Sequence, residues 1–315
     1  MTAALWLARR LGLLILTMLA VSLLVHLALE ANMGGIAVKV LGQFSTPDQR
    51  AAWLLENGYD RPFAVRYFDW LGNFVAGNWG KSTYYQEDIV RLIRPRLGAS
   101  AILAGAALLV MVPLSLILGI AAGARAGSAL DRSVSVFAIV TTSIPDFASA
   151  AFLTAIFVLG LGWLPAVSAM AGGFDIRELV LPVLVLVLAS TGYLARMTRA
   201  SMIDVMAQPY IRTALLKGAS PVRIILHHAL RNALLTPVTV IMLQIPWIFS
   251  GVIVVEVFFA YRGFGTLLYQ AALNSDVYLV EACAMISVLA VVASQLLADL
   301  AYLALDPRLR TGGKR

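Results

Sequence analysis

Six long runs of residues that carry almost no charge constrain this sequence more than any other feature. They are residues 11–29, 99–124, 133–160, 179–195, 232–255 and 282–305, and the charges inside them are Asp146 and Asp299. Each run has 17 residues or more, and an α-helix of about 20 residues crosses the ~30 Å hydrocarbon layer of a membrane. Only 13% of all residues are charged, about half the share in a soluble domain. The runs predict an all-α polytopic membrane protein with six transmembrane helices.

The first run follows a pair of arginines and could belong to a signal peptide. Its 19 apolar residues are long for one and no clear cleavage site follows, so we expect a retained span. The single cysteine, Cys283, excludes an intrachain disulfide and a multi-cysteine metal site, and we interpret it as a small core residue. We interpret His26 as a packing residue. Because the adjacent His227 and His228 would point about 100° apart on a helix, we expect them to be solvated or interfacial rather than to bind a metal.

The positive charges predict the orientation of the chain. Fourteen of the 24 Lys and Arg residues lie in the N-terminus and in residues 125–132, 196–231 and 306–315, whereas the short loops on the other side, 161–178 and 256–281, hold one each. Basic residues accumulate on the cytoplasmic side of a membrane, so both termini are expected to be cytoplasmic. The net charge of +7 thus reflects mainly the basic residues of the segments expected to be cytoplasmic. The sequence has no basic stripe with interleaved aromatic residues, so a nucleic-acid partner is not expected.

This topology divides the chain into four predicted parts. These are a cytoplasmic N-terminus with the first span (1–29), an external cap (30–98), a five-helix membrane core (99–305) and a cytoplasmic tail (306–315).

The cytoplasmic loop 196–231 predicts a short helix between two breaks. Pro209 suits the first position of a helix, where its missing N–H costs nothing. Gly218 suits the left-handed position after a helix end, and Ser220 and Pro221 suit the N-cap and first residue of the next helix. The helix between these breaks would have about eight residues and a length of roughly 12 Å.

This short helix has a predicted apolar face made of Ile211, Ala214 and Leu215, at i, i+3 and i+4. A helix of this length is marginal in water, so it must dock on this protein or on a partner. The residues alone leave two interpretations open: a surface helix at the membrane interface, and a lever that a cytoplasmic partner grips and moves.

Several short motifs carry a resemblance to a known family. Tyr210–Gly218, followed by His228–Leu235, resembles the EAA loop of bacterial ABC-importer permeases. The Arg-Thr-Ala form of its triplet is similar to the dipeptide/oligopeptide/nickel branch, in the first (B-type) subunit. Further motifs similar to those of this family occur in the family's order along nearly the whole chain. They are Gly58–Pro62, Gly77–Ser82, Leu161–Pro165, Val255–Phe258, Gly263–Gly265 and Asp306–Arg310.

The resemblance implies a type I ABC-importer permease fold and a pore subunit of an ATP-driven, binding-protein-dependent importer in the bacterial inner membrane. Its implied partners, besides membrane lipid, are a second (C-type) permease, two ABC ATPase subunits and an extracytoplasmic substrate-binding protein. ATP and Mg would bind to the ATPases, and this chain would have no enzymatic activity, metal or cofactor of its own. Its implied coupling helix would contact the ATPases through Tyr210, Ile211, Arg212, Thr213, Ala214, Leu215, Lys217 and Gly218.

Three charged residues are candidates for the translocation path or its gate. Asp146 lies in a span and follows Pro145, so it could bond to a helix kink or contact a cationic substrate. Glu256 ends the fifth run and suits an external gate or turn. Arg262 stands where the similar family has proline. Asp299, near the end of the last run, suits a capping or interfacial role.

Other functions find less support in the sequence. Short peptides are the expected substrate, and nickel chelates, glutathione, or opine and sugar conjugates remain open. A secondary transporter would have an internal repeat and charged, broken helices at mid-membrane, whereas this sequence shows no convincing repeat and most of its runs are free of charge. A hydrolase would need a catalytic motif, and the sequence shows none of the common ones. Gly80-Lys81-Ser82 resembles the end of a phosphate-binding loop, but Val75 replaces the glycine that such a loop requires.

Overall fold

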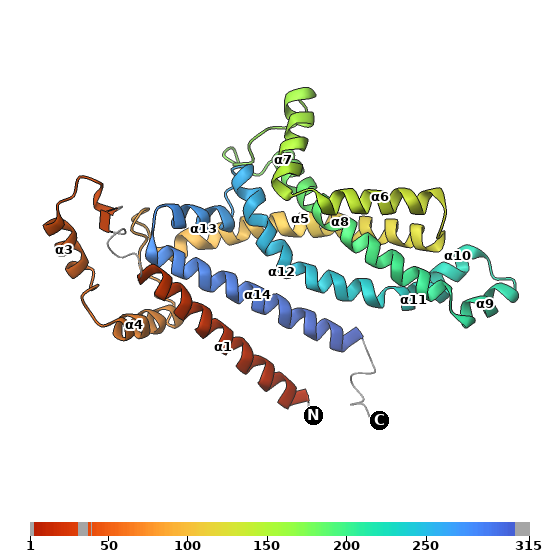
Figure 1. The fold of residues 1–315 in the computed structure, drawn as a ribbon, viewed down its shortest axis with the longest axis horizontal. Coiled ribbons are helices and arrows are strands. Elements are labelled where there is room, and N and C mark those ends of the chain that lie inside the picture. The colour runs from red at the N-terminus through yellow and green to blue at the C-terminus, as the bar shows by residue number, and fades with distance from the viewer. Residues whose placement is uncertain (1–2, 31–36, 39, 306–315) are drawn as a thin grey trace. The chain divides into compact units, whose positions relative to one another are not determined.

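The computed structural model describes residues 3–30, 37–38 and 40–305, with backbone alone for residues 3–8, 29–30, 246–251 and 298–305. The described chain forms helices and turns (Figure 1), with one isolated bridge between Lys81 and Asp88. The predicted all-α membrane fold is confirmed. The side chain of Asp299 and the predicted tail 306–315, with its Asp306–Arg310 motif, lie outside what is described.

Four helices are each long and apolar enough to cross a membrane: α1 (Ala3–Glu30), α5 (Ile89–Ala124), α8 (Ile176–Met206) and α14 (Val277–Leu305). Two bent assemblies raise the number of spans to as many as six. In one, α6 (Ala129–Ser143) meets α7 (Asp146–Thr154), which continues into the π-helical turn η1 (Ala155–Gly160). In the other, α10 (Pro221–Arg223), η2 (Ile224–Ala229) and α11 (Leu230–Ala233) lead into α12 (Leu235–Phe258). The shorter helices are α3 (Pro47–Glu56), α4 (Phe63–Val75), α9 (Pro209–Leu216) and α13 (Phe264–Leu273).

The third predicted run, 133–160, is not one straight helix. The two helices that it forms meet at an angle of 104°. Pro145 lacks an N–H and disfavours helical backbone at the residue before it, and Ile144 is accordingly extended, with φ −93° and ψ 124°. The break itself follows from the sequence, but the size of the bend does not.

The described chain divides into two compact units. Unit 1 contains the residues up to Ser100 together with Arg262–Val292, and unit 2 contains Ala101–Tyr261 together with the residues from Ala293 onward. The boundary predicted between a cap at 30–98 and a core at 99–305 stays a prediction.

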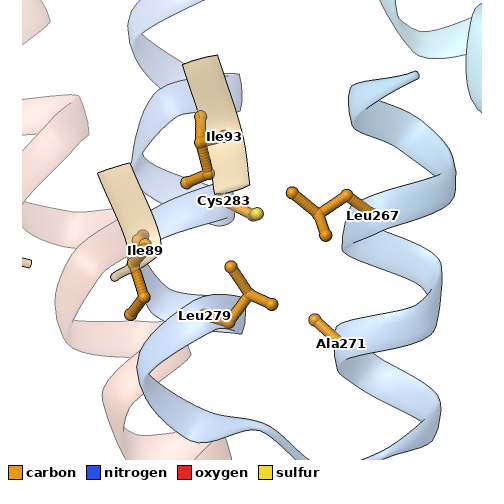
Figure 2. Close-up of a cluster of buried hydrophobic side chains, with 7 residues drawn as sticks. Ile89, Ile93, Leu267, Ala271, Leu279 and Cys283 are labelled. Carbon is orange, nitrogen blue, oxygen red and sulfur yellow. The ribbon is translucent and has the colours of Figure 1, made fainter. Parts of the chain in front are cut away.

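The core of unit 1 joins the start of α5 to α13 and α14 (Figure 2). Ile89, Ile93, Leu267 and Leu279 are at most 1% exposed, and Cys283 lies among them with no exposed surface. The interpretation of Cys283 as a small core residue is confirmed.

A buried carboxylate holds the segment before α5 against the start of α14. Asp276 caps α14 by accepting a hydrogen bond from the backbone N–H of Leu279 (3.3 Å). Its other oxygen accepts from the Ser82 hydroxyl and from the backbone N–H of Tyr84 (3.2 Å). This role for Ser82 accounts for a hydroxyl at the end of the Gly77–Ser82 motif, and it was not foreseen.

Glycines let α8 approach α5 and α6 closely within unit 2. A Cβ on Gly119 would lie 2.4 Å from Cβ of Thr198, and one on Gly123 would lie 2.6 Å from Cβ of Met202. The two glycines are four residues apart, the spacing with which membrane helices bring their backbones together. Helix α8 also has Gly192, whose Cβ would lie 2.3 Å from Oγ1 of Thr141 in α6.

Helix α8 also tolerates a proline because a distant hydroxyl replaces the lost hydrogen bond. Pro182 lies inside the helix and leaves the carbonyl of Glu178 without its helical donor. The hydroxyl of Ser168 donates to that carbonyl at 2.5 Å, and the N–H of Ser168 donates to the carbonyl of Phe259 at 2.8 Å. The segment before α8 is thereby fixed to the end of α12.

We expect Gly119→Ala to destabilise unit 2, because the added methyl must displace the α8 backbone. Overpacking of this kind costs about 1–3 kcal/mol. The matched control is Gly105→Ala on the same helix, where an added Cβ meets nothing within 4 Å. Thermal unfolding of the purified protein in nanodiscs compares the two, and an equal melting temperature for both variants would contradict the close packing.

Candidate functional site

The predicted short helix is present as α9, from Pro209 to Leu216. Pro209 occupies the first turn, as expected. At the other end the N–H of Gly218 donates to the carbonyl of Leu215 (2.9 Å), and the N–H of Ala219 donates to the carbonyl of Ala214 (3.1 Å). These two bonds form a Schellman cap, with Gly218 at φ +78°. The predicted start and end of this helix are confirmed.

The chain restarts as a helix at the predicted residues. The side chain of Ser220 accepts a hydrogen bond from the N–H of Arg223 (3.4 Å), and Pro221 follows as the first helical residue. The helix then widens into the π-helical turn η2, which no local signal in the sequence indicated. His227 and His228 lie on this turn, and both are exposed, as predicted.

The inner face of α9 docks on its own chain. Ile211 has no exposed surface and packs with Met202 of α8, Ile224 of η2 and the small residues Ala229 and Ala233. These contacts belong to unit 2 alone. Docking on this protein was one of the two possibilities that the sequence left open.

The predicted apolar face of α9 is only partly right. Ala214 packs on the cluster around Ile211, as expected, but Leu215 is 53% exposed. The Schellman cap explains this difference, because it folds the chain back so that Ala219 packs on the same cluster. Ala219 therefore takes the place that helical spacing assigned to Leu215.

The outer face of α9 exposes apolar and cationic side chains together. Leu216 is 82% exposed and Tyr210 is 40% exposed, and Arg212, Thr213 and Lys217 are also exposed. Leu216 was missed as a candidate because it lies off the face that begins at Ile211. The sequence does contain a signal for Leu216: it is apolar at a position that faces away from the core. A large exposed leucine on a short helix is typical of a contact with another protein.

Two polar contacts connect the α9 region to the ends of membrane helices. The amide of Asn232 donates to the Tyr210 hydroxyl (2.9 Å), which links α9 to the approach to α12. The hydroxyl of Ser201 in α8 donates to the carbonyl of Ala233 (2.8 Å). Neither pair is indicated by the sequence, because the partners are far apart in it.

A buried ion pair joins two loops that the charge pattern assigned to one side of the membrane. Asp131, 3% exposed, accepts from the guanidinium of Arg199 through both oxygens, with Nη2 to Oδ2 at 2.8 Å. The N–H of Gly127 also donates to Oδ2 (2.9 Å). The start of α6 is thereby held against α8 near the α9 end of that helix.

The bend between α6 and α7 forms part of a polar hollow of about 540 Å³ in unit 2. Asp146 lines it at the first position of α7, together with Thr141 and Thr142 of α6, Tyr193 of α8 and Gln244 of α12. The hydroxyls of both threonines donate to carbonyls of their own helix. Asp146 was a predicted candidate, whereas Tyr193 and Gln244 were not.

The other two gate candidates lie elsewhere. Glu256 is fully buried near the end of α12 and is not among the residues that line the hollow. Burial, and to a smaller extent the Glu256 carboxylate, raises the pKa of the Tyr261 hydroxyl to about 12, so Tyr261 stays protonated at neutral pH. Arg262 is exposed and belongs to unit 1. A gating role for these residues stays a prediction.

Comparison with known proteins identifies the family. Residues 115–311 match the model of the binding-protein-dependent transport system inner membrane component. The oligopeptide transport system permease protein AppB of Bacillus subtilis is 31% identical over 313 residues, covering 97% of this chain and 99% of AppB. The di/tripeptide transport system permease protein DppB of Pseudomonas aeruginosa is 30% identical over 330 residues, covering 97% and 98%.

The chain therefore belongs to the family of binding-protein-dependent transport system inner membrane components. It is an ABC-importer permease, a multi-pass membrane subunit, as the resemblance of its motifs predicted.

We expect Ile211→Ala to loosen α9 from unit 2, because it empties a fully buried site at a cost of about 2–5 kcal/mol. Leu216→Ala is the matched control, since it removes a similar side chain from the exposed face of the same helix and should change stability by no more than about 0.5 kcal/mol. Hydrogen exchange of the amides in residues 211–219 measures the difference. Equal protection in the two variants would mean that Ile211 does not anchor the helix.

Proposed function

We propose that this chain is the transmembrane pore subunit of an ATP-driven, binding-protein-dependent importer of short peptides, and that α9 is its coupling helix. The observation that carries the proposal is the two-sided construction of α9. Ile211 fixes the inner face to unit 2, while the exposed Leu216, Leu215 and Tyr210 on the other face are available to a partner. The peptide substrate is supported by the relatives AppB and DppB, which are named as permease proteins of an oligopeptide and a di/tripeptide transport system.

The contacts of α9 define how force would reach the pore. A movement of α9 would act on Met202 of α8 through Ile211, and on the base of α12 through the bond between Asn232 and Tyr210. The same two helices line the polar hollow further along, with Tyr193 on α8 and Gln244 on α12. Met202 and Tyr193 are nine residues apart, which is roughly 14 Å along a helix. Rigid helices could carry a displacement over this distance.

The proposed partners are two ABC ATPase subunits that grip α9, a homologous second permease and an extracytoplasmic binding protein. ATP and Mg would bind to the ATPases, and closure of the ATPase pair would shift the permease between inward-open and outward-open states. The hollow beside Asp146 would then be part of the translocation path. Uptake driven by an ion gradient with the purified chain alone would refute this proposal and favour a secondary transporter.

The proposed orientation places residues 30–98 outside the cell and residues 125–132 and 196–231 in the cytoplasm, with both termini inside. The ion pair between Asp131 and Arg199 supports one part of it, because it requires residues 125–132 and 196–231 to lie on the same side of the membrane, and the positive charge of these segments suits the cytoplasmic side.

We expect Phe44→Cys to react with a membrane-impermeant maleimide on intact spheroplasts, because Phe44 is 99% exposed in the segment proposed to be external. Arg125→Cys, at an exposed position of the segment 125–132 proposed to be cytoplasmic, should react only after permeabilisation. The native Cys283 adds little background, since it has no exposed surface. Labelling of Arg125→Cys in intact spheroplasts would reverse the proposed topology.

We expect Gly218→Val to uncouple ATP hydrolysis from peptide uptake. A valine in the left-handed conformation costs roughly 1 kcal/mol or more, so the Schellman cap opens and α9 no longer keeps one position. Gly42→Val is the matched control, because Gly42 has a similar φ of +91°, an added Cβ there also meets nothing within 4 Å, and it belongs to unit 1 and to the segment proposed to be external. Proteoliposomes containing the whole complex give peptide transported per ATP hydrolysed. A normal ratio for Gly218→Val in a folded complex would contradict the coupling role.

A further inference from the structure

A second cavity, of about 310 Å³, lies entirely within unit 1. Its wall combines aromatic and charged side chains from five places: the end of α1, the turn at residues 57–61, α4, residues 78–80 and the start of α14. This volume is at the lower end of the range of small-molecule sites, about 300–1,000 Å³. The function proposed above does not use this cavity.

A buried carboxylate with one unused oxygen lines this cavity. Glu281 of α14 is 1% exposed, and its Oε1 pairs with Nδ1 of His26 from α1. Among the described residues, its Oε2 has no hydrogen-bond partner, and neither has Nε2 of His26. A buried charged oxygen without a donor costs free energy, and acidic residues within membrane helices are rare unless they have a function. The unused oxygen is therefore a candidate acceptor for a ligand.

Aromatic rings lie around His26, the partner of this carboxylate, and along the cavity wall. The rings of Trp70 and Phe63 lie 5.9 Å and 5.3 Å from the His26 ring, and Trp79 lines the same cavity. The hydroxyls of Tyr59 and Tyr278 share a hydrogen bond. Burial, Tyr278 and Glu281 raise the pKa of the Tyr59 hydroxyl, so it stays protonated. Faces of Trp, Tyr and Phe attract cations, which favours a positively charged ligand group beside Glu281.

The remaining charges make the cavity suitable for a ligand with both signs of charge. Arg61 and Asp69 form an ion pair with each other. The guanidinium of Arg66 lies 5.6 Å from the centre of the Tyr59 ring and close enough to Glu281 to interact with its charge. A ligand ammonium could thus donate to Glu281 while a ligand carboxylate is attracted by Arg66. An anion without an amine would be attracted by Arg66 but would leave Oε2 of Glu281 without a donor.

We propose that this cavity binds the protonated amino end of a short peptide, with Glu281 as the residue that accepts its N–H bonds. This rests on the proposed function, because it places a second binding position for the transported class of substrate outside the polar hollow at Asp146. Its position in unit 1, on the end of α1 followed by the segment proposed to be external, suits a site that a peptide occupies before it enters the pore.

The test is a calorimetric titration of the full chain, in nanodiscs with the subunits that copurify with it, using Ala-Ala and N-acetyl-Ala-Ala as probes. Because Glu281→Gln removes the negative charge of the acceptor, we expect it to weaken Ala-Ala binding about tenfold to hundredfold. Acetylation of the probe should weaken binding to the unaltered protein to a similar extent. Glu56→Gln is the matched control, since Glu56 is exposed and lies outside the cavity.

Two results would overturn this inference: equal affinity of the unaltered protein for both probes, or equal affinity of the Glu281→Gln and Glu56→Gln variants for Ala-Ala. The comparison of the probes decides even if Glu281→Gln fails to fold. Peptide uptake by the same complex separates the two proposals. Uptake without amine-dependent binding leaves the importer function intact and removes only this site, whereas absence of ATP-driven uptake refutes the function itself.

Discussion

The need to satisfy every backbone hydrogen bond inside a membrane governs this structure. No water is available there, so a spanning segment must be a helix, and a break in a helix needs a replacement partner. The hydrogen bond that Pro182 removes inside α8 is replaced by the hydroxyl of Ser168, which donates to the freed carbonyl of Glu178. The break at Pro145 coincides instead with a polar hollow. At Pro182 and Pro145, therefore, a lost backbone hydrogen bond coincides with a polar side chain that bonds or lines a cavity nearby.

Much of the fold could be predicted because its signals are local. Long charge-free runs indicate spans wherever they occur, and the start and end of α9 follow from Pro209 and Gly218, whose backbone preferences are intrinsic. The burial of Leu215 was predicted wrongly, because it depends on which residue reaches the cluster around Ile211 in three dimensions. Helical spacing identifies a face, but it does not show that Ala219, beyond the end of the helix, packs there instead.

Polar pairs between distant segments could not be predicted for a related reason. His26 and Glu281 are 255 residues apart in the sequence, and Asp131 and Arg199 are 68 apart. No spacing rule relates such positions, since the fold alone brings them together. An acidic residue at the border of an apolar run, as Glu281 is, offers a hint, but it does not identify the partner. The sequence therefore indicated the candidate coupling helix and missed the cavity of unit 1.

The glycine contacts of α8 have a mechanical consequence. Where backbones touch at Gly119, Gly123 and Gly192, no free volume is left for one helix to slide or rotate against the next. The second half of α5, α6 and α8 should then behave as one stiff body, and deformation should concentrate where such contacts are missing. The extended residues Ile144 and Pro145 lie at the edge of this body. A flexible hinge at the edge of a stiff body turns a small displacement into a change of the angle between α6 and α7, while the packing inside the body stays the same.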